Sequence, residues 1–290
     1  MIRRAPSSWS KHRHVMTGLA ERLTAEFDDK LPTDLGRVAK SRAVRLIEFC
    51  PLLVDGGLSV VQDGFSIFVR SEASEAKEFT KLFAEDGTGK LLPVSVAKRV
   101  RYTIAHEIAH TLLFDIETFP PQPKIRPKKG MGIRGLEHAC NDLAGVLLLP
   151  QTAVLREASN PNRLMDPNYL RDLCDKALVS RANLVNRLAH IKNINLPAGI
   201  IASAKETESG WRLTAITRHY TLRDMFPKVT VGSFLDDLIG ESAYLSISVT
   251  KTPTIIRVAK YKFECLIETK ASGYSKRSSF VTLRRLESVD

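Results

Sequence analysis

The sequence predicts an α+β protein in which a region of helices with a small sheet is followed by a helical segment and then by a β-rich region. Three observations lead to this fold class. Apolar residues recur at spacings of three and four over residues 94–112 and 136–149, which is the helical period. Residues 151–193 look entirely helical, and short runs rich in β-branched residues dominate from residue 199 onward. We therefore expect three parts, namely 1–150, 151–195 and 196–290, the last a mixed α/β sensor or interaction domain.

Length and charge narrow the class of protein. The 290 residues are enough for two or three compact domains, and an apolar fraction of 43% can supply a hydrophobic core. The net charge of +11, from 43 Lys and Arg against 32 Asp and Glu, favours anionic partners such as nucleic acid or an acidic protein surface. A basic surface more often serves general solubility, so weak DNA binding is a secondary prediction.

The sequence indicates neither a membrane anchor nor a disulfide framework. No stretch approaches the roughly 20 apolar residues that span a bilayer, and Glu21 and Arg22 interrupt the first apolar run before it reaches signal-peptide length. The cysteines are far apart and form no C-x-x-C pair, which favours a reducing compartment; they are Cys50, Cys140, Cys174 and Cys265. We expect a cytoplasmic protein without a membrane partner.

The first hundred residues predict two helices and a hairpin. Residues 1–14 are basic and are expected to form a flexible arm. Apolar spacing then predicts helices over Val15–Phe27 and Val38–Phe49. Two runs rich in β-branched and aromatic residues predict a β-hairpin. These runs are Leu58–Val61 and Phe65–Val69, and Asp63-Gly64 lies between them. The polar residues 71–93 predict a loop or insert.

The remaining elements are predicted from the spacing of apolar residues and from the positions of proline and glycine. A helix is expected from Val94 that ends before Pro120, and the Pro- and Lys-rich residues 115–135 predict a basic surface loop. A second long helix is expected over Leu136–Leu149. Shorter helices follow, the last with Ser180 as its N-cap: Val154–Glu157, Pro167–Lys176 and Arg181–Ile191. The expected strands are Ile200–Ala202, Trp211–Ile216, Ala243–Val249, Thr254–Val258, Lys262–Ile267 and Ser279–Leu283.

The pentad His106-Glu107-Ile108-Ala109-His110 carries the strongest chemical signal. On a helix, residues four apart lie on one face, so both imidazoles can reach one ion, and zinc accepts imidazole nitrogen readily. Glu107 is placed beside the metal, where it can take a proton from a water on the ion. The alternative is a helix with two exposed histidines and a solvated glutamate. The surrounding amphipathic pattern favours the zinc motif.

A catalytic zinc needs a third protein ligand and an open position, and the next predicted helix supplies one. Glu137 is the preferred ligand, with Asn141 four residues later on the same face to hydrogen-bond a ligand imidazole. His138 points about 100° away from Glu137 on a helix, and a Cys140 thiolate would suit a closed site. Asp142 is a further candidate.

Two blocks of sequence resemble the ImmA/IrrE metallopeptidases. They are Arg101–Leu113, which contains the pentad, and Glu137–Pro150, with its E-x-x-x-N and closing L-L-x-P. The resemblance covers about residues 40–195 and departs in the longer Pro- and Lys-rich segment between the blocks. It implies a zincin-like fold with a helix-turn-helix-like segment after Pro150, and a GAF-like sensor domain at the C-terminus by architecture alone.

The resemblance also implies an activity. His106, His110 and Glu137 would bind Zn²⁺, Glu107 would be the catalytic base, and the substrate would be a helix-turn-helix repressor cleaved in response to stress or DNA damage. Mn²⁺ could replace Zn²⁺ in the cell. Phe65–Val69 could pair with an extended substrate as an edge strand, although a core strand is the simpler reading. Tyr102 and His138 could assist an oxyanion, although packing is the simpler role for each.

Two other functions remain open at this stage. A DNA-binding regulator could use basic residues of the helices around 168–192, although a packing module with a solvated basic face is favoured; these residues are Arg171, Lys176, Arg181, Arg187 and Lys192. A metal-binding sensor without hydrolysis is the third possibility. The intact Glu107 argues against it, since a site freed from catalysis has no need for a base beside the metal.

Overall fold

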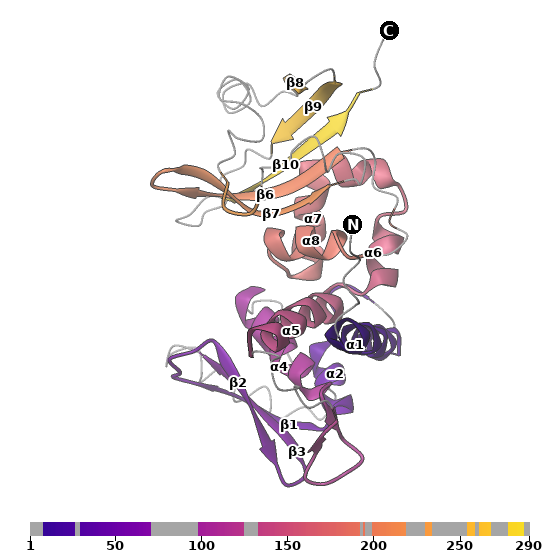
Figure 1. Cartoon of the computed structure of the whole chain (residues 1–290), viewed down its shortest axis with the longest axis vertical. Coiled ribbons are helices and arrows are strands. Elements are labelled where there is room, and N and C mark those ends of the chain that lie inside the picture. The colour runs from indigo at the N-terminus through magenta and orange to yellow at the C-terminus, as the bar shows by residue number, and fades with distance from the viewer. Residues whose placement is uncertain are drawn as a thin grey trace. The chain divides into compact units, whose positions relative to one another are not determined.

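A computed structural model describes residues 8–26, 30–70, 98–124, 133–191, 194, 199–218, 230–233, 254–258, 261–267 and 278–286. Over these residues the protein is a mixed α+β structure, which confirms the predicted class (Figure 1). The chain divides into two compact units. The first contains residues 1–153 and 177–179, and the second contains 154–176 and 180–290.

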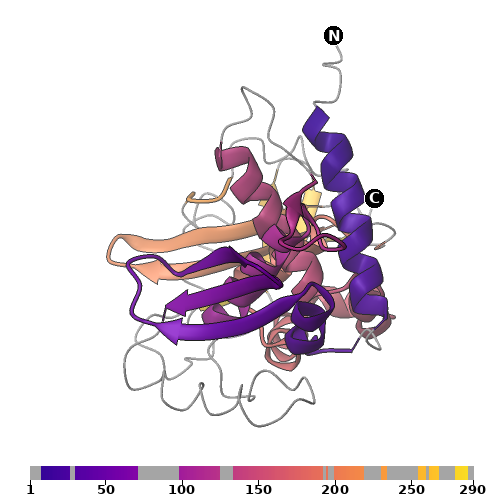
Figure 2. The ribbon, with the colours of Figure 1, turned by 90° about the horizontal axis from the view of Figure 1, so that it is seen from below.

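The first unit combines helices with a three-stranded sheet. Its helices are α1 (Ser8–Ala25), α2 (Leu35–Ser41), α4 (Lys98–Thr111) and α5 (Ile133–Leu148). Its sheet has the order β1-β3-β2, from β1 (Val44–Cys50), β2 (Gly56–Val61) and β3 (Gly64–Arg70). Strand β3 is therefore central, parallel to β1 and antiparallel to β2 (Figure 2). A two-stranded ribbon joins β4 (Phe114–Asp115) to β5 (Gln122–Pro123).

The predicted hairpin is confirmed, and Gly64 shows why the turn needs glycine. Gly64 has φ +152°, and a Cβ built on it would lie 2.0 Å from the carbonyl oxygen of Ala43. This close approach allows the Phe65 N–H to donate to the same oxygen at 2.9 Å, which joins the start of β3 to the start of β1.

The prediction of one helix over residues 38–49 is wrong. Helix α2 ends at Ser41, Ala43 adopts the left-handed conformation with φ 57°, and β1 begins at Val44. A residue in that conformation cannot continue a right-handed helix. The strand is held by parallel pairing with β3, a partner about twenty residues away, which local apolar spacing cannot reveal.

The expected arm over residues 1–14 needs a partial correction. Helix α1 begins at Ser8, so residues 8–14 are helical, while residues 1–7 and Phe27 lie outside the described residues. In the sequence, Trp9 is the one large apolar residue between positions 8 and 14, so hydrophobic spacing placed the helix start too late. The polar segment 71–93 and the start of the predicted helix at Val94 also lie outside the described residues.

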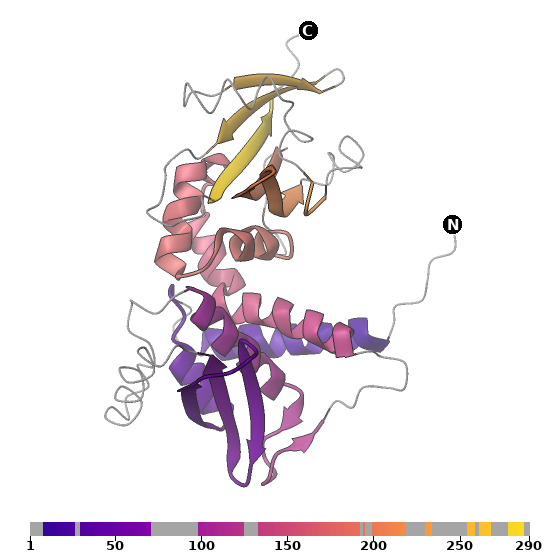
Figure 3. The ribbon, with the colours of Figure 1, turned by 90° about the vertical axis from the view of Figure 1, so that its left-hand side faces the viewer.

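Helix α4 is held between the sheet and α5. It packs on β2 and β3 on one side, α5 packs against it, and α1 packs on α5 (Figure 3). The central part of its apolar face is buried, with Ile104 and Ile108 at 1% and 0% exposure. The buried guanidinium of Arg42 donates to the carbonyl oxygens of Thr111 at 2.7 Å and Phe114 at 3.2 Å, which satisfies carbonyls at the C-terminal end of α4. The histidine-bearing helix is thus fixed along its length and at its end.

The second unit places short helices against a five-stranded antiparallel sheet of order β7-β6-β10-β9-β8. Ser180 caps the last helix by accepting from the Asn183 N–H at 3.1 Å, as predicted. The helical elements are α6 (Gln151–Glu157), the 3-10 helix η1 (Pro161–Met165), α7 (Pro167–Ala177) and α8 (Arg181–Leu188). The strands are β6 (Gly199–Thr207), β7 (Gly210–Arg218), β8 (Thr254–Val258), β9 (Tyr261–Ile267) and β10 (Ser278–Arg285).

Four of the predicted strand runs after residue 199 match observed strands directly, and Ile200–Ala202 forms part of the longer β6. The run Ala243–Val249 lies outside the described residues. Buried aromatic side chains from β9 and β10, Phe263 and Phe280, help to form the core of this sheet. None of the described helices has the length and apolar character needed to cross a membrane.

Candidate metal centre

Helix α4 presents His106 and His110 one turn apart on the face opposite its buried apolar stripe. Their side chains are 15% and 17% exposed, and their Nε2 atoms lie 3.1 Å apart. Glu107, between them in sequence, is turned inward and only 6% exposed. The helical period thus brings two ligand nitrogens together and places a buried carboxyl beside them.

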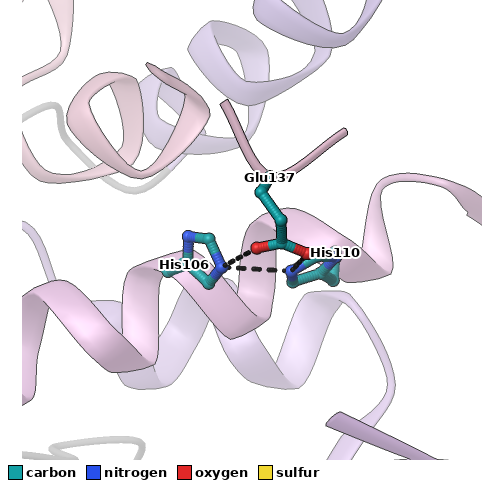
Figure 4. Close-up of side chains that lie close together, drawn as sticks. All are labelled: His106, His110 and Glu137. Carbon is teal, nitrogen blue, oxygen red and sulfur yellow. Dashed lines mark hydrogen bonds and ion pairs between the residues drawn. The ribbon is translucent and has the colours of Figure 1, made fainter. Parts of the chain in front are cut away.

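Glu137, on the first turns of α5, completes the group. Its Oε2 lies 3.1 Å from His106 Nε2, and its Oε1 lies 3.6 Å from His110 Nε2 (Figure 4). The three residues form a group that could hold a metal ion. Helices α4 and α5 therefore supply the two-histidine, one-glutamate set at the sequence-predicted positions.

The size of this group suits a tetrahedral metal. Zinc binds imidazole nitrogen at about 2.0–2.1 Å, so two neighbouring ligand atoms in a tetrahedron lie about 3.3 Å apart. The observed separations of 3.1, 3.1 and 3.6 Å scatter around this value. Two imidazole nitrogens and a carboxylate are ligand atoms that a divalent ion accepts, and here they converge at partly buried positions. The donor set fits a divalent ion.

The second nitrogens of the two imidazoles have different surroundings. His110 Nδ1 lies 3.4 Å from the Cys140 sulfur. His106 Nδ1 is buried and has no hydrogen-bond partner among the described residues. Both Nε2 atoms face Glu137, so the protons of neutral imidazoles are accommodated on the Nδ1 atoms when the Nε2 atoms bind a metal. Cys140 thus contacts the back of a ligand and lies outside the ligand group.

The electrostatics of the site favour ligand and base chemistry. Burial, reinforced by His106, lowers the pKa of His110, which keeps that imidazole in the neutral form that binds metals. Burial, reinforced by Glu137, raises the pKa of Glu107 to about 7. Burial also raises the pKa of the Cys140 thiol to about 12, so Cys140 is a neutral thiol near neutral pH. A carboxyl with a pKa near 7 matches the requirement for a proton carrier at physiological pH.

An open cleft of about 690 Å³ runs past these residues. Asp55, Tyr102, Thr103 and Asn141 give one part of its lining polar character, and the apolar lining comes from Leu58, Leu113, Phe114, Pro123 and Leu136. Residues Gly56 and Gly57 of β2 also line it. A Cβ on Gly56 would lie 2.5 Å from Thr103 Cγ2 and 3.1 Å from Glu107 Oε1, so only glycine lets β2 approach the site this closely.

The sheet order confirms the simpler reading of Phe65–Val69, a core strand, and leaves the substrate-pairing alternative without an edge there. Phe65–Val69 lies in β3, which is paired on both sides and has no free edge within its sheet. Strand β2 is paired only with β3 within the described sheet, and it is β2 that borders the cleft. Phe65–Val69 belongs to the more apolar of the two adjacent strands, and the more apolar strand is the one expected at the centre.

Asn141 also has a different partner from the predicted one. Its Oδ1 accepts a hydrogen bond from the Tyr102 hydroxyl at 2.9 Å, and no bond to an imidazole is present among the described residues. Asn141 lies four residues after Glu137, and Tyr102 lies four residues before His106. The two helices therefore meet at two successive levels, one formed by the ligands and one by this pair. The hydrogen-bond partner of Asn141 is decided by how α4 and α5 cross, and the helical period alone does not specify this partner.

The other candidates on α5 do not join the ligand group. His138 is exposed and Asp142 is half-buried, and neither belongs to a metal-sized cluster among the described residues. Tyr102 lines the cleft, and burial raises its pKa to about 12. The sequence indicated Tyr102 as a site candidate, whereas it did not indicate the cleft residues Asp55, Gly56 and Phe114.

The basic residues considered for DNA recognition are mostly engaged within the second unit. Arg171 pairs with Asp172 at 2.8 Å and Lys176 with Glu157 at 2.7 Å. Arg181 lies 5.6 Å from the centroid of the Phe280 ring, and Arg187 is 5% exposed. Lys192 lies outside the described residues. These contacts favour the packing role over a free basic recognition face.

Comparison with known proteins adds little to this geometry. No family model and no curated protein matches the chain. Among solved structures, it is similar to a Mycobacterium tuberculosis transcriptional regulator, with 13% sequence identity, coverage of 96% of this chain and 80% of that chain, and a TM-score of 0.46. A similarity of this size carries no argument about function.

Proposed function

We propose that the protein is a zinc-dependent endopeptidase whose active site is the cleft of the first unit. One observation carries the proposal: the ligand atoms of His106, His110 and Glu137 form a group of tetrahedral size, with the buried Glu107 carboxyl beside it and an open cleft in front. Structural zinc sites usually have four protein ligands, whereas three protein ligands and an accessible position are typical of hydrolytic zinc sites.

The chain's own residues would divide the work. His106, His110 and Glu137 would hold the ion, which supplies Lewis acidity and lowers the pKa of water to near neutrality. Glu107 would accept a proton from the attacking water and deliver it to the leaving amine. The raised pKa of Glu107 suits this exchange, because a base with a pKa near 7 can both take and return a proton at neutral pH.

The cleft would receive an extended segment of a protein substrate. Strand β2 offers an edge to the cleft at Gly56 and Gly57, and pairing along an edge holds a peptide by its main chain without reading its sequence. The apolar wall around Leu113 and Phe114 would take a hydrophobic side chain next to the cleaved bond.

The sequence blocks around the ligands support a more specific version of this proposal. They resemble the ImmA/IrrE metallopeptidases, which implies a zincin-like fold over residues 1–150, a helix-turn-helix-like segment over 151–195 and a helix-turn-helix repressor as substrate in a stress response. A GAF-like domain over residues 196–290 is proposed from the architecture alone. Zinc is the proposed metal because two imidazoles and a carboxylate suit it, and manganese is the alternative.

Co-expression with a repressor encoded beside this gene tests the activity. We expect the zinc-loaded chain to cut the repressor into discrete fragments in intact-mass spectra, and a chelator to stop the cleavage. Glu107→Gln should keep one zinc per chain but reduce cleavage by about 10²–10⁴-fold, since it removes the proton acceptor. Full biological activity of Glu107→Gln would refute hydrolysis and leave a metal-binding sensor as the better description.

A further inference from the structure

The Tyr102–Asn141 pair is a feature of the cleft that the proposed chemistry does not use. Both side chains line the cleft, and the Tyr102 hydroxyl donates to Asn141 Oδ1 at 2.9 Å. Asn141 is exposed and makes no other hydrogen bond among the described residues. A polar pair that lies inside a substrate cleft has two possible roles: a clamp between α4 and α5, or a contact for the substrate.

The hydrogen bond fixes which end of the amide is free. Tyr102 remains a neutral phenol, with an O–H to donate, because burial raises its pKa to about 12. With Oδ1 occupied by that O–H, the amide is held with its nitrogen away from Tyr102, and Asn141 keeps two N–H donors for another group. These donors suit a carbonyl oxygen and do not suit a cation or a second donor.

The spacing along α5 suits an extended peptide. Glu137 and Asn141 are four residues apart on a helix, which separates their positions by about 6 Å along the axis. In an extended strand, carbonyls on the same side recur every second residue, at about 6.6 Å. A peptide carbonyl placed at the ligand group would therefore have another carbonyl, two residues along, near Asn141.

The direction of the cleft agrees with this spacing. Asp55, at the start of the cleft wall, pairs with Arg99 near the beginning of α4, and Gly56 comes next, beside Thr103 and Glu107. Strand β2 therefore follows the line of α4 past the ligands. A peptide paired with β2 would lie along the same line, with its alternate carbonyls facing β2 and facing the helices.

We propose that Asn141 donates a hydrogen bond to a main-chain carbonyl of the substrate two residues from the cleaved bond, and that Tyr102 is the positioning residue that orients the Asn141 amide. The inference rests on the proposed peptidase site. It specifies the substrate further, as a peptide that is extended over at least three residues where it crosses the site. A helical or tightly turned segment could not reach the ligand group and Asn141 together.

Peptide hydroxamates test the contact without any need for the natural substrate. Acetohydroxamic acid reaches only the metal, whereas trialanine hydroxamates extended toward the amino or the carboxyl side also reach along the cleft. For the zinc-loaded full chain we expect one extended series to bind more tightly than acetohydroxamic acid. For each variant, calorimetry measures the affinity for the extended hydroxamate and the affinity for acetohydroxamic acid. The ratio of the first to the second is the quantity compared between variants.

Asn141→Asp separates the two roles of the pair. Aspartate keeps the size of the side chain and can still accept the Tyr102 hydrogen bond, but it cannot donate to a carbonyl. We expect the affinity ratio to fall by about three- to tenfold, which is the range for one hydrogen bond. Asn141→Ala should give a similar loss if the aspartate variant does not fold. Tyr102→Phe should give a smaller loss, since the amide remains but can turn.

Each outcome decides a different claim. An unchanged affinity ratio in Asn141→Asp would overturn the inference and identify the pair as a clamp, as would a loss confined to zinc affinity. A wild-type chain that binds zinc and acetohydroxamic acid but gains nothing from extension would overturn the inference and leave the proposed peptidase site intact. A chain that binds no zinc would overturn both.

Discussion

The candidate metal ligands of the first unit and the basic side chains of α7 and α8 in the second unit make different kinds of contact. In the first, His106, His110 and Glu137 turn ligand atoms toward one another at an open cleft. In the second, the basic side chains of α7 and α8 contact carboxylates or an aromatic ring, as in the pairs Lys176–Glu157 and Arg181–Phe280. Within the described residues, the histidine–glutamate group is the one cluster of His, Cys, Asp and Glu that has the size of a metal site.

The contacts of the basic side chains in the second unit stabilise the fold, whereas the arrangement of the histidines and the glutamate in the first unit suits the binding of a ligand. An ion pair satisfies its own charges, and on a surface it contributes about 0–1 kcal/mol. Two imidazoles and a carboxylate that converge at an open cleft present the ligand atoms that a divalent cation binds. The candidate metal site therefore lies in the first unit, and we expect perturbations there and in the second unit to have distinct effects on metal binding.

Removal of a proposed metal ligand should produce the largest difference in zinc affinity between substitutions in the two units. Glu137→Ala takes away one of three protein ligands, and we expect zinc affinity to fall roughly 100-fold or more. Glu157→Ala, which removes a carboxylate from the Lys176 pair of the second unit, is the matched control and should leave zinc affinity unchanged. Competition with a fluorescent chelator measures both. Equal losses in the two variants would contradict the assignment of the site.

Zinc should stabilise the first unit selectively. At a free zinc concentration of 100 Kd, a ligand that binds only the folded state adds about 2.7 kcal/mol of stability. Amides of α4 and α5 that exchange through unfolding of the first unit should then exchange about 100-fold more slowly. Amides of β6 and β10 serve as the internal control and should change little. Hydrogen exchange detected by mass spectrometry measures these rates. Equal slowing of amide exchange in both units would show that zinc does not act at this cleft alone.

In the zinc-free chain, Glu107 should make a contribution to stability that decreases as pH rises toward neutrality. Burial raises the pKa of Glu107 from 4.5 to about 7, so the folded state holds a proton that the unfolded state releases. This contribution to stability is fully present below about pH 4.5 and is lost as pH rises through 7, with a size on the order of 2–3 kcal/mol.

Glu107→Gln should remove that part of the pH dependence. Urea unfolding of the zinc-free wild type and variant between pH 5 and pH 8 measures the difference. Parallel stability curves for the two proteins would show that Glu107 titrates as an ordinary exposed carboxyl.

Cysteine substitutions should give the smallest difference in zinc affinity between the two units. Cys140 contacts His110 Nδ1 at 3.4 Å, and loss of a group behind a ligand imidazole lowers metal affinity by about tenfold or more when that contact orients the ring. We expect about a tenfold loss for Cys140→Ala, because a thiol is a weak acceptor. Cys174→Ala, an equally buried cysteine of the second unit, should not change zinc affinity. Identical affinities in both variants would show that Cys140 only fills space.

The sequence predicts the metal site better than it predicts the surroundings of the site. His106, Glu107 and His110 lie within one helix, so their relation depends only on local period. Glu137 could be placed because the next helix offers few suitable ligands. The partner of Asn141 and the order of β1, β2 and β3 depend on how distant segments cross. No local pattern contains that information, which is why residues 44–49 were read as helix.

The zinc coordination shell is the most direct test of the account. X-ray absorption at the zinc edge of the full chain should show only nitrogen and oxygen neighbours at about 2.0–2.1 Å, with scattering from two imidazoles. This result would agree with His106, His110 and Glu137 as ligands and an open fourth position. A sulfur neighbour at about 2.3 Å would place Cys140 on the metal, and it would contradict a hydrolytic site with a glutamate ligand.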